Sequence, residues 1–363
     1  MGGVQQSVSF FKILFLALVF TTTSAWASYG HDGHDHNHNH DNVEHAEESE
    51  KFNPVEMIMH HIKDAHEWHL FDLKGEDGEL HGVSIPLPNI LYTEGNLDIF
   101  MSSAFDHGHS TYKTADGERE YAIHHEHITE VSGLSVLDFS ITKNVFVLFF
   151  TAFLMVLIFG AVASNYKKNS GAPKGIAKFM EPLIVFVRDD IAKPNISNGP
   201  ERFMPYLLTV FFFIWLNNLL GLVPFFPGGA NLTGNISFTM VLAVFTMIIT
   251  NTKANKHYWK HIFMPPVPWP MWIIMIPVEL IGILTKPFAL MIRLFANITA
   301  GHIIVLSLVS LIFIFESVAV SPISMALMLF INCLELLVAA LQAYIFTLLS
   351  ALFIGMATEE AHH

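Results

Sequence analysis

The sequence has a single cysteine and few charged residues. Cys333 stands alone, so no disulfide can form within the chain, and in its apolar surroundings it is typical of a packing residue rather than a nucleophile. Only 14% of the 363 residues are charged and 52% are hydrophobic, whereas soluble domains carry about 25% charged residues. Basic residues are scarce as well, with 19 Lys and Arg against 32 Asp and Glu. These shortages exclude a wholly soluble protein and a nucleic-acid partner.

The charges that are present divide the chain into two parts. Residues 28–138 hold 23 of the acidic residues and 16 of the 21 histidines, but only five Lys or Arg. Residues 139–363 hold 13 Lys or Arg and nine acidic residues. We therefore expect an acidic segment in water to be followed by a membrane domain, residues 139–363.

The first 27 residues have the parts of a secretory signal peptide. Lys12 precedes an eight-residue apolar run, and a Thr-Thr-Thr-Ser stretch then leads to Ala25-Trp26-Ala27, a small-x-small cleavage site. The apolar run is too short to cross a bilayer. The alternative is an uncleaved anchor, because only one lysine precedes the run. Cleavage after Ala27 would place residues 28–138 outside the cytoplasm.

Residues 28–66 form a segment rich in His, Asp and Glu, for which we expect a flexible chain. Imidazoles that alternate with carboxylates can bind Zn, Ni or Cu. A weak metal site would consist of His31, His34, His36, His38 and His40. We favour the alternative of a solvated and disordered acidic leader, because no ligand geometry is fixed by the pattern. Apart from such an ion, no cofactor is expected.

Residues 67–138 have a different pattern. Short apolar runs at 68–71, 83–87 and 97–100 lie between Gly, Asn and Asp turn signals. Such alternation over short runs is typical of strands joined by turns. It predicts a small β-rich domain on the extracytoplasmic side of the membrane.

Three stretches of the membrane domain are apolar enough for membrane spans, at 145–163, 203–223 and 236–250. Lys and Arg cluster in the loops 164–202 and 251–261, whereas the loop 224–235 carries no charge. Because cytoplasmic loops attract Lys and Arg, the two basic loops should face the cytoplasm and the uncharged loop should lie outside. Residues 176–191 have apolar positions at helical spacing, which predicts a helix on the cytoplasmic surface.

Two longer apolar stretches, 271–315 and 322–357, end the sequence. As helices they would be about 67 and 57 Å long, against a hydrocarbon core of about 30 Å. Each is therefore either broken into two spans or one strongly tilted helix, and both alternatives leave the C-terminus in the cytoplasm. With tilted helices, the expected fold is a mainly α, polytopic membrane protein. It would have about five membrane helices, one surface helix and the small β-rich segment.

Few polar side chains interrupt these two stretches, and ionisable residues inside a membrane are functional candidates by default. They recur at intervals of seven, at Glu279, Lys286 and Arg293 and at Glu335 and Gln342. Packed antiparallel, the helices would bring His302 near Glu335 and Arg293 near Gln342. The alternative is a structural role, in which these groups hold a helix bundle together. That alternative is weakest for Arg293, because a guanidinium keeps its charge even in lipid.

Several short motifs follow one another in a fixed order along the membrane domain. They are Asn218–Pro224 (NLLGLVP), Thr285-Lys286-Pro287, Arg293–Asn297 (RLFAN), Gly301 and Leu341–Phe346 (LQAYIF). In this order and spacing they resemble the a subunit of F-type ATP synthases, over about residues 140–360. The resemblance implies a proton-translocating subunit, not an enzyme on its own, in the inner membrane of a bacterium, with a periplasmic N-terminal segment. It implies as partners a ring of c subunits, the b-subunit stalk and the other synthase subunits.

The resemblance also implies roles for single residues. Arg293 matches the essential arginine that faces the proton-carrying carboxylate of the ring, lowers the pKa of that carboxylate and blocks a leak between two half-channels. His302 and Glu335 match the titratable pair of the outer half-channel. The other matches are Asn297 and Gln342 near the arginine, Asn218 toward the outer channel and Glu279 toward the proton exit. The two long tilted helices would pack against the ring.

The sequence departs from the family pattern at Gly221, where some relatives carry a carboxylate, and in its leader and His-rich segment. Two other functions account for parts of the sequence. A stand-alone ion-coupled secondary transporter would use Arg293, His302 and Glu335, but no inverted repeat is visible. A metal sensor built on residues 31–45 would leave the polar residues of the last two helices unexplained. We favour the ATP synthase subunit.

Overall fold

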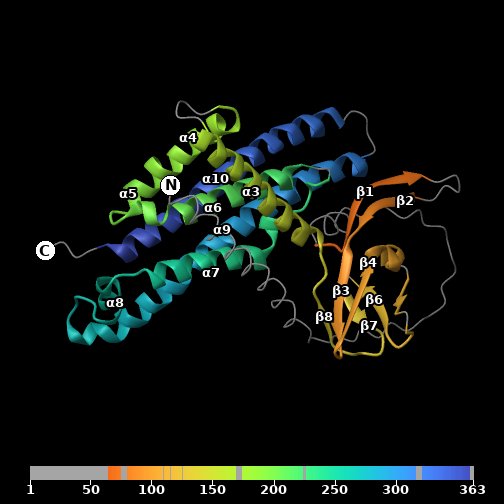
Figure 1. Ribbon diagram of the computed structural model, residues 1–363, viewed down its shortest axis with the longest axis horizontal. Coiled ribbons are helices and arrows are strands. Elements are labelled where there is room, and N and C mark those ends of the chain that lie inside the picture. The colour runs from red at the N-terminus through yellow and green to blue at the C-terminus, as the bar shows by residue number, and fades with distance from the viewer. Residues whose placement is uncertain are drawn as a thin grey trace.

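The computed structural model describes residues 64–74, 80–108, 110–114, 116–124, 126–168, 174–223, 226–315 and 321–359. The expected signal peptide and the histidines of residues 31–40 lie outside the described residues. The strands lie at one end of the molecule, and α8 and the last turns of α10 lie at the opposite end of the helical body (Figure 1). The two ends of the helices are therefore covered by different parts of the chain.

Residues 67–138 form three small antiparallel sheets, with strand orders β1-β2, β4-β3-β8 and β5-β6-β7. The elements are β1 (Glu67–Lys74), β2 (Leu80–Pro86), β3 (Pro88–Thr93), β4 (Asn96–Met101), η2 (Ser102–Gly108), β5 (Tyr112–Lys113), β6 (Glu120–His124), β7 (His127–Glu130) and β8 (Val136–Asp138). Leu91, Phe100 and Tyr121 pack in a small core shared by the second and third sheets. Asp98 accepts hydrogen bonds from Arg119 Nε at 2.9 Å and from Tyr121 Oη at 2.7 Å, which ties β4 to β6.

The rest of the described chain is helical. The longer helices are α3 (Lys143–Lys168), α4 (Ile176–Phe186), α6 (Met204–Leu222), α7 (Ile236–Thr252), α8 (Lys256–Phe263), α9 (Trp272–Phe315) and α10 (Ser321–Thr358). The shorter ones are η3 (Val187–Ala192), α5 (Lys193–Asn195), η4 (Pro200–Arg202), η5 (Leu232–Gly234) and η6 (Trp269–Met271). Among the described residues, α3, α6, α9 and α10 are long and apolar enough to span a membrane. The expected mainly α, polytopic membrane protein is thereby confirmed.

The third expected span, 236–250, differs from the other spans. Helix α7 is only 17 residues long. It is long enough to cross a membrane only together with α8, and the two helices are bent by 100° relative to each other. The number of candidate spans among the described residues is therefore four, or five if the bent pair counts as one. The expected loop 251–261 also contains most of α8. A loop was expected because three lysines dominate the composition there, whereas Tyr258, Trp259 and Ile262 give that segment an apolar side.

The last two apolar stretches each form one unbroken helix. Helix α9 has 44 residues and contains Pro277 and Pro287 without being interrupted, and α10 has 38 residues. At 1.5 Å per residue, each is about twice as long as the hydrocarbon core is thick. The alternative of broken spans is thus wrong for both helices.

Helix α6 lies at the centre of the helical body and packs against α10 and α3. Of the apolar part of α6, 61% is buried inside the chain, whereas of the apolar part of α9 only 11% is buried. The expected surface helix 176–191 is continued by the π-helix η3 and by α5 as far as Asn195. Its apolar residues Val187 and Ile191 are fully buried where η3 packs on α6 and α10. Helix α6 is thus covered by the rest of the chain, whereas most of the surface of α9 is exposed.

The C-terminal end of α10 packs closely against two loops, one after α5 and one between α7 and α8. Asn255 Nδ2 and Asn198 Nδ2 donate hydrogen bonds to the carbonyl oxygen of Thr358 at 2.6 and 3.1 Å, which satisfies an acceptor that the end of a helix leaves open. One turn earlier, a Cβ added to Gly355 would lie within 1.8 Å of the carbonyl oxygen of Asn195. A glycine is therefore required at this contact between α10 and α5.

We expect Gly355→Ala to destabilise the helical body by about 1–3 kcal/mol, because the new methyl group meets backbone that can only move together with α5. Thermal unfolding of the purified protein, followed by circular dichroism, measures the effect. Gly160→Ala on α3 is the matched control, since a Cβ there has nothing within 4 Å. Equal melting temperatures for the two variants would contradict the close contact.

Candidate functional site

The two long helices bring His302 and Glu335 together, as their spacing predicts. His302 Nδ1 on α9 lies 4.0 Å from Glu335 Oε1 on α10, and the two side chains are 18% and 11% exposed. Glu335 Oε1 itself is buried and has no hydrogen-bond partner among the described residues. A carboxylate oxygen left in this state is costly unless a proton or a water satisfies it. The pair is therefore a place where a proton can be held.

One glycine makes room for this pair, and a second glycine lies next to it. A Cβ added to Gly301 would stand 2.5 Å from Glu335 Oε1, so only glycine lets α9 approach the carboxylate this closely. A Cβ added to Gly221 on α6 would stand 4.0 Å from His302 Nε2. The position at which the sequence departs from the family pattern therefore faces the imidazole.

A cavity of about 320 Å³ opens beside the pair, between α6, α9, α10 and the loop before α7. Its polar lining consists of Asn218, Asn231, Thr233, Asn297, His302, Glu335 and Gln342. Five of these seven residues are candidates from the sequence. The other residues that line the cavity are apolar or glycine, so these seven side chains are the polar groups of its wall.

Asn218 links this cavity to two other parts of the fold. Its Nδ2 donates to the carbonyl oxygen of Ala339 at 3.0 Å, and its Oδ1 accepts from Thr233 Oγ1 at 2.7 Å. Asn218 and Thr233 are both buried. These two hydrogen bonds of the amide fix α6 against α10 and hold the loop that contains η5 against the cavity.

Thr233 and Asn231 were missed in the sequence, where residues 224–235 appear only as an uncharged loop. Three polar residues at alternate positions, Asn231, Thr233 and Asn235, directly precede α7. That alternation next to a span was the available signal. It could not be recognised as functional without knowing that the loop folds back over α6.

Arg293 lies outside the cavity. Its side chain is exposed on α9, and it makes no hydrogen bond or ion pair with any described residue, Gln342 included. The neighbouring Ile292 and Phe288 are exposed as well. Arg293 thus places a fixed positive charge on an apolar face one helical turn from Asn297, which lines the cavity.

Glu279 is remote from these residues and lies at the α8 end of α9. Its Oε1 is 3.9 Å from His261 Nδ1 on α8, and the two side chains are 29% and 47% exposed. Lys286, two turns further along α9, has its Nζ 5.7 Å from the ring centre of Phe353, an arrangement typical of a cation–π contact. The structure therefore separates Glu279 from the other candidates.

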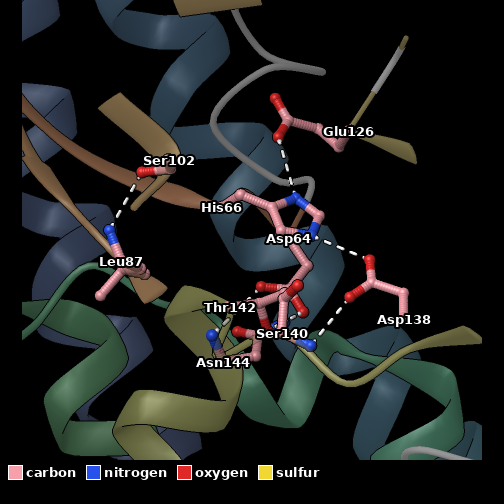
Figure 2. A network of polar contacts seen from close by, with 9 residues as sticks. All are labelled: Asp64, His66, Leu87, Ser102, Glu126, Asp138, Ser140, Thr142 and Asn144. Carbon is pink, nitrogen blue, oxygen red and sulfur yellow. Dashed lines mark hydrogen bonds and ion pairs between the residues drawn. The ribbon is translucent and has the colours of Figure 1, made fainter. Parts of the chain in front are cut away.

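A second buried polar cluster, also missed in the sequence, lies where the strands meet α3 (Figure 2). His66 Nε2 is 3.2 Å from Asp138 Oδ2, and His66 Nδ1 is 4.0 Å from Glu126 Oε2. Asp64 accepts hydrogen bonds from Thr142 Oγ1 at 2.8 Å and from the backbone N–H of Asn144 at 3.1 Å. Because Asn144 is in the first turn of α3, Asp64 caps that helix from a distant part of the sequence.

Burial and charge act in opposite directions on this cluster. Burial lowers the pKa of His66, but the hydrogen bond and charge of Asp138, with the nearby carboxylates of Glu126 and Asp64, outweigh it and raise that pKa from 6.5 to about 9. Burial would raise the pKa of Asp138, but its hydrogen bond to His66 lowers it. Burial raises the pKa of Asp64 despite its hydrogen bonds. The cluster therefore keeps an imidazolium between carboxylates at neutral pH.

The weak metal site considered as an alternative for residues 28–66 is not tested by the described residues. Among the described residues, no group of three or more His, Cys, Asp or Glu side chains could hold a metal ion. The histidines proposed for that site, His31 to His40, lie outside the described residues. Metal binding by that segment stays a prediction.

The sequence matches two known families. A family described as "ATP synthase A chain" matches residues 145–355, and one described as "Domain of unknown function (DUF8433)" matches residues 57–144. The boundary between the two matches coincides with the start of α3. All the cavity residues lie in the first match.

Single relatives agree with the first match. The chain is 51% identical over 240 residues to "ATP synthase subunit a" of Chloroherpeton thalassium, covering 64% of this chain and 70% of the relative. It is 51% identical over 244 residues to "ATP synthase subunit a 2" of Chlorobaculum tepidum, covering 65% and 67%. With "ATP synthase subunit a" of an Anaeromyxobacter species it shares 39% identity over 319 residues, covering 85% and 71%.

The raised pKa of His66 makes the stability of the strand–helix junction depend on pH. A pKa of about 9 in the folded state, against about 6.5 unfolded, gives a contribution of about 3 kcal/mol that is complete below pH 6.5 and is lost as the pH rises through 9. Limited proteolysis of residues 64–144 in the intact protein, from pH 6 to pH 10, should show this loss. His66→Gln, which has no such proton to lose, should show no comparable step, and an identical step in the variant would refute the assignment.

Proposed function

The chain belongs to the ATP synthase A chain family, the proton-translocating membrane subunits of ATP synthase, and from this we propose how its own residues carry protons. The observation that carries the proposal is the combination on α9 of an exposed Arg293, which has no partner among the described residues, with a polar cavity one turn away. We assign the cavity to the outer half-channel and the exposed face of α9 to the surface that meets a ring of c subunits. No observation favours a stand-alone transporter.

Arg293 needs a counter-charge from another chain. A guanidinium on an apolar face inside a membrane is expensive to leave alone, and no described residue of this chain pairs with it. A carboxylate on a rotating ring would supply the missing charge, and the fixed cation would favour its ionised form. The ring carboxylate must then release its proton before it passes Arg293, so the proton cannot bypass the ring.

His302 and Glu335 would exchange protons with the ring on the outer side. An imidazole and a carboxylate 4.0 Å apart can share one proton and pass it on. Asn218, Asn297 and Gln342 supply uncharged donors and acceptors along the wall of the same cavity. Amide side chains orient water without binding a proton themselves. They therefore suit a proton path between the His302–Glu335 pair and the ring carboxylate.

Glu279 would serve the other end of the path. It lies with His261 beside α8, at the end of the molecule opposite to the strands. The basic loops next to α8 suggest that this end faces the cytoplasm. In this orientation the strands lie outside a bacterial inner membrane, and the C-terminus lies inside.

The remaining partners follow from the same assignment. The helix α4, with η3 and α5, presents exposed charged residues, among them Arg188 and Lys193, on the side away from α6. A stalk of b subunits would hold the subunit still while the ring turns. The subunit itself is a non-catalytic component of the complex, and ATP forms elsewhere in it.

Arg293→Ala should reduce proton-driven ATP synthesis to background while the assembled complex stays in the membrane. The reason is that a ring carboxylate without a facing cation would keep its proton, and direct leakage would no longer be opposed. Membrane vesicles energised by a pH step measure the rate, and immunoblots of the purified complex measure assembly. Arg202→Ala, which removes an exposed arginine on η4, should retain synthesis, and normal synthesis in Arg293→Ala would end the proposal.

The proximity of His302 and Glu335 predicts that the two positions can be exchanged. The double variant His302→Glu with Glu335→His keeps one imidazole and one carboxylate in the cavity, so it should retain more synthesis than either single change. The comparison uses the same energised vesicles with the amount of complex matched. Equal loss in all three variants would show that the two groups do not act as a pair.

A further inference from the structure

The buried cluster around His66 lines a second, smaller cavity. It has a volume of about 60 Å³ and is lined on its polar side by Asp64, His66, Asp138, Ser140, Asn144 and Ser237. We call this cavity the vestibule. A water occupies about 30 Å³ in the liquid and needs several polar partners, so the vestibule has room for about two waters.

One loop forms a wall of both the vestibule and the half-channel cavity. Leu232 and Asn235 line the vestibule, while Asn231 and Thr233 line the half-channel cavity. Residues of the same short loop therefore line the vestibule on one side and the cavity of His302 and Glu335 on the other. Asn235 Oδ1 accepts hydrogen bonds from the first backbone N–H groups of α7, which keeps this thin wall in a defined place.

Buried polar atoms point to water on both sides of this wall. Asn144 Oδ1 beside the vestibule has no hydrogen-bond partner among the described residues. Asn231 Nδ2 and Glu335 Oε1 beside the half-channel cavity are in the same state. Since buried polar groups are almost always satisfied, both cavities are suited to hold water that would complete these bonds.

We propose that the vestibule is the outer entrance of the proton path, and that His66 is the group that receives protons from the outside and passes them through the vestibule toward His302 and Glu335. The inference rests on the proposed function, because it extends the outer half-channel to the surface of the strand-rich segment. In each transfer the imidazolium of His66 gives a proton from one of its nitrogens to a water of the vestibule, which becomes hydronium. The neutral imidazole then takes up a proton from the outer solution, which restores the imidazolium, and no other bond changes.

The charges around His66 suit this task. Carboxylates face it from three elements, Asp64 before β1, Glu126 in the turn between β6 and β7, and Asp138 on β8, while Lys143 at the start of α3 is the nearby cation. The excess of negative charge attracts protons from an outside solution in which they are scarce. The raised pKa of His66, about 9, keeps the site occupied even when the outside is mildly alkaline.

Blocking the vestibule tests the route directly. In a Cys333→Ser background, Ser237→Cys is treated from the outside of intact cells with a small membrane-impermeant methanethiosulfonate, and proton-driven ATP synthesis is then measured in vesicles. We expect labelling and a loss of most of the synthesis relative to the unlabelled variant. Ser110→Cys, exposed on the strand-rich segment away from both cavities, should be labelled without loss. Absence of labelling at position 237, or labelling without loss, would overturn the route.

The pH profile tests the role of His66. With His66→Gln, proton uptake should fall with the outer proton concentration, about tenfold per pH unit above neutrality, whereas the wild type should hold its rate up to about pH 9. The two should agree near pH 6. His124→Gln, the same change at an exposed histidine of β6, should follow the wild type. A uniform loss at every pH would indicate a structural role only and would overturn the assignment of His66, as would an unchanged profile.

These outcomes are separable from those that test the proposed function. If the family mechanism does not apply, Arg293→Ala keeps synthesis whatever happens at the vestibule. If only the vestibule is wrong, Arg293→Ala abolishes synthesis while labelled Ser237→Cys and His66→Gln behave like the wild type. The amount of assembled complex is measured for every variant, so loss of folding is not mistaken for loss of the path.

Discussion

A positive charge that no described residue of this chain neutralises is the constraint on which the rest of the structure depends. Arg293 stands on a helix of which little is buried inside the chain, and a guanidinium cannot lose its charge to suit lipid. The exposed face of α9 is therefore the place where a further negative charge would be most favourable. Helix α9 packs against α10 and α7, which hold the charge at a fixed position along the helical body.

The membrane architecture was largely predictable, because hydrophobicity alone determines which segments can enter lipid. The spans at α3, α6, α9 and α10 were found within a few residues of their ends. Hydropathy could not show that α9 runs unbroken past Pro277 and Pro287, since a kinked span and a continuous helix have the same composition. It also missed α8, whose lysines concealed an apolar side.

The candidate site was predictable where it depends on helical periodicity. The meeting of His302 with Glu335 follows from two antiparallel helices, and helical spacing also placed Glu279 and Arg293 on one side of α9. What the sequence could not show were contacts across long separations. His66 and Asp138 are 72 residues apart, and Thr233 reaches Asn218 from a loop that looked featureless. Such pairs depend on tertiary packing, for which neither propensity nor periodicity gives a signal.

The glycine opposite His302 has a consequence for how many proton-binding groups share the cavity. With no side chain at Gly221, His302 and Glu335 are the only ionisable residues among the described residues that line it. A carboxylate on α6 would form a three-body system, in which each group's affinity for a proton depends on the state of two others. Here each group has one such neighbour, so a proton that enters the cavity has only two side chains to which it can bind.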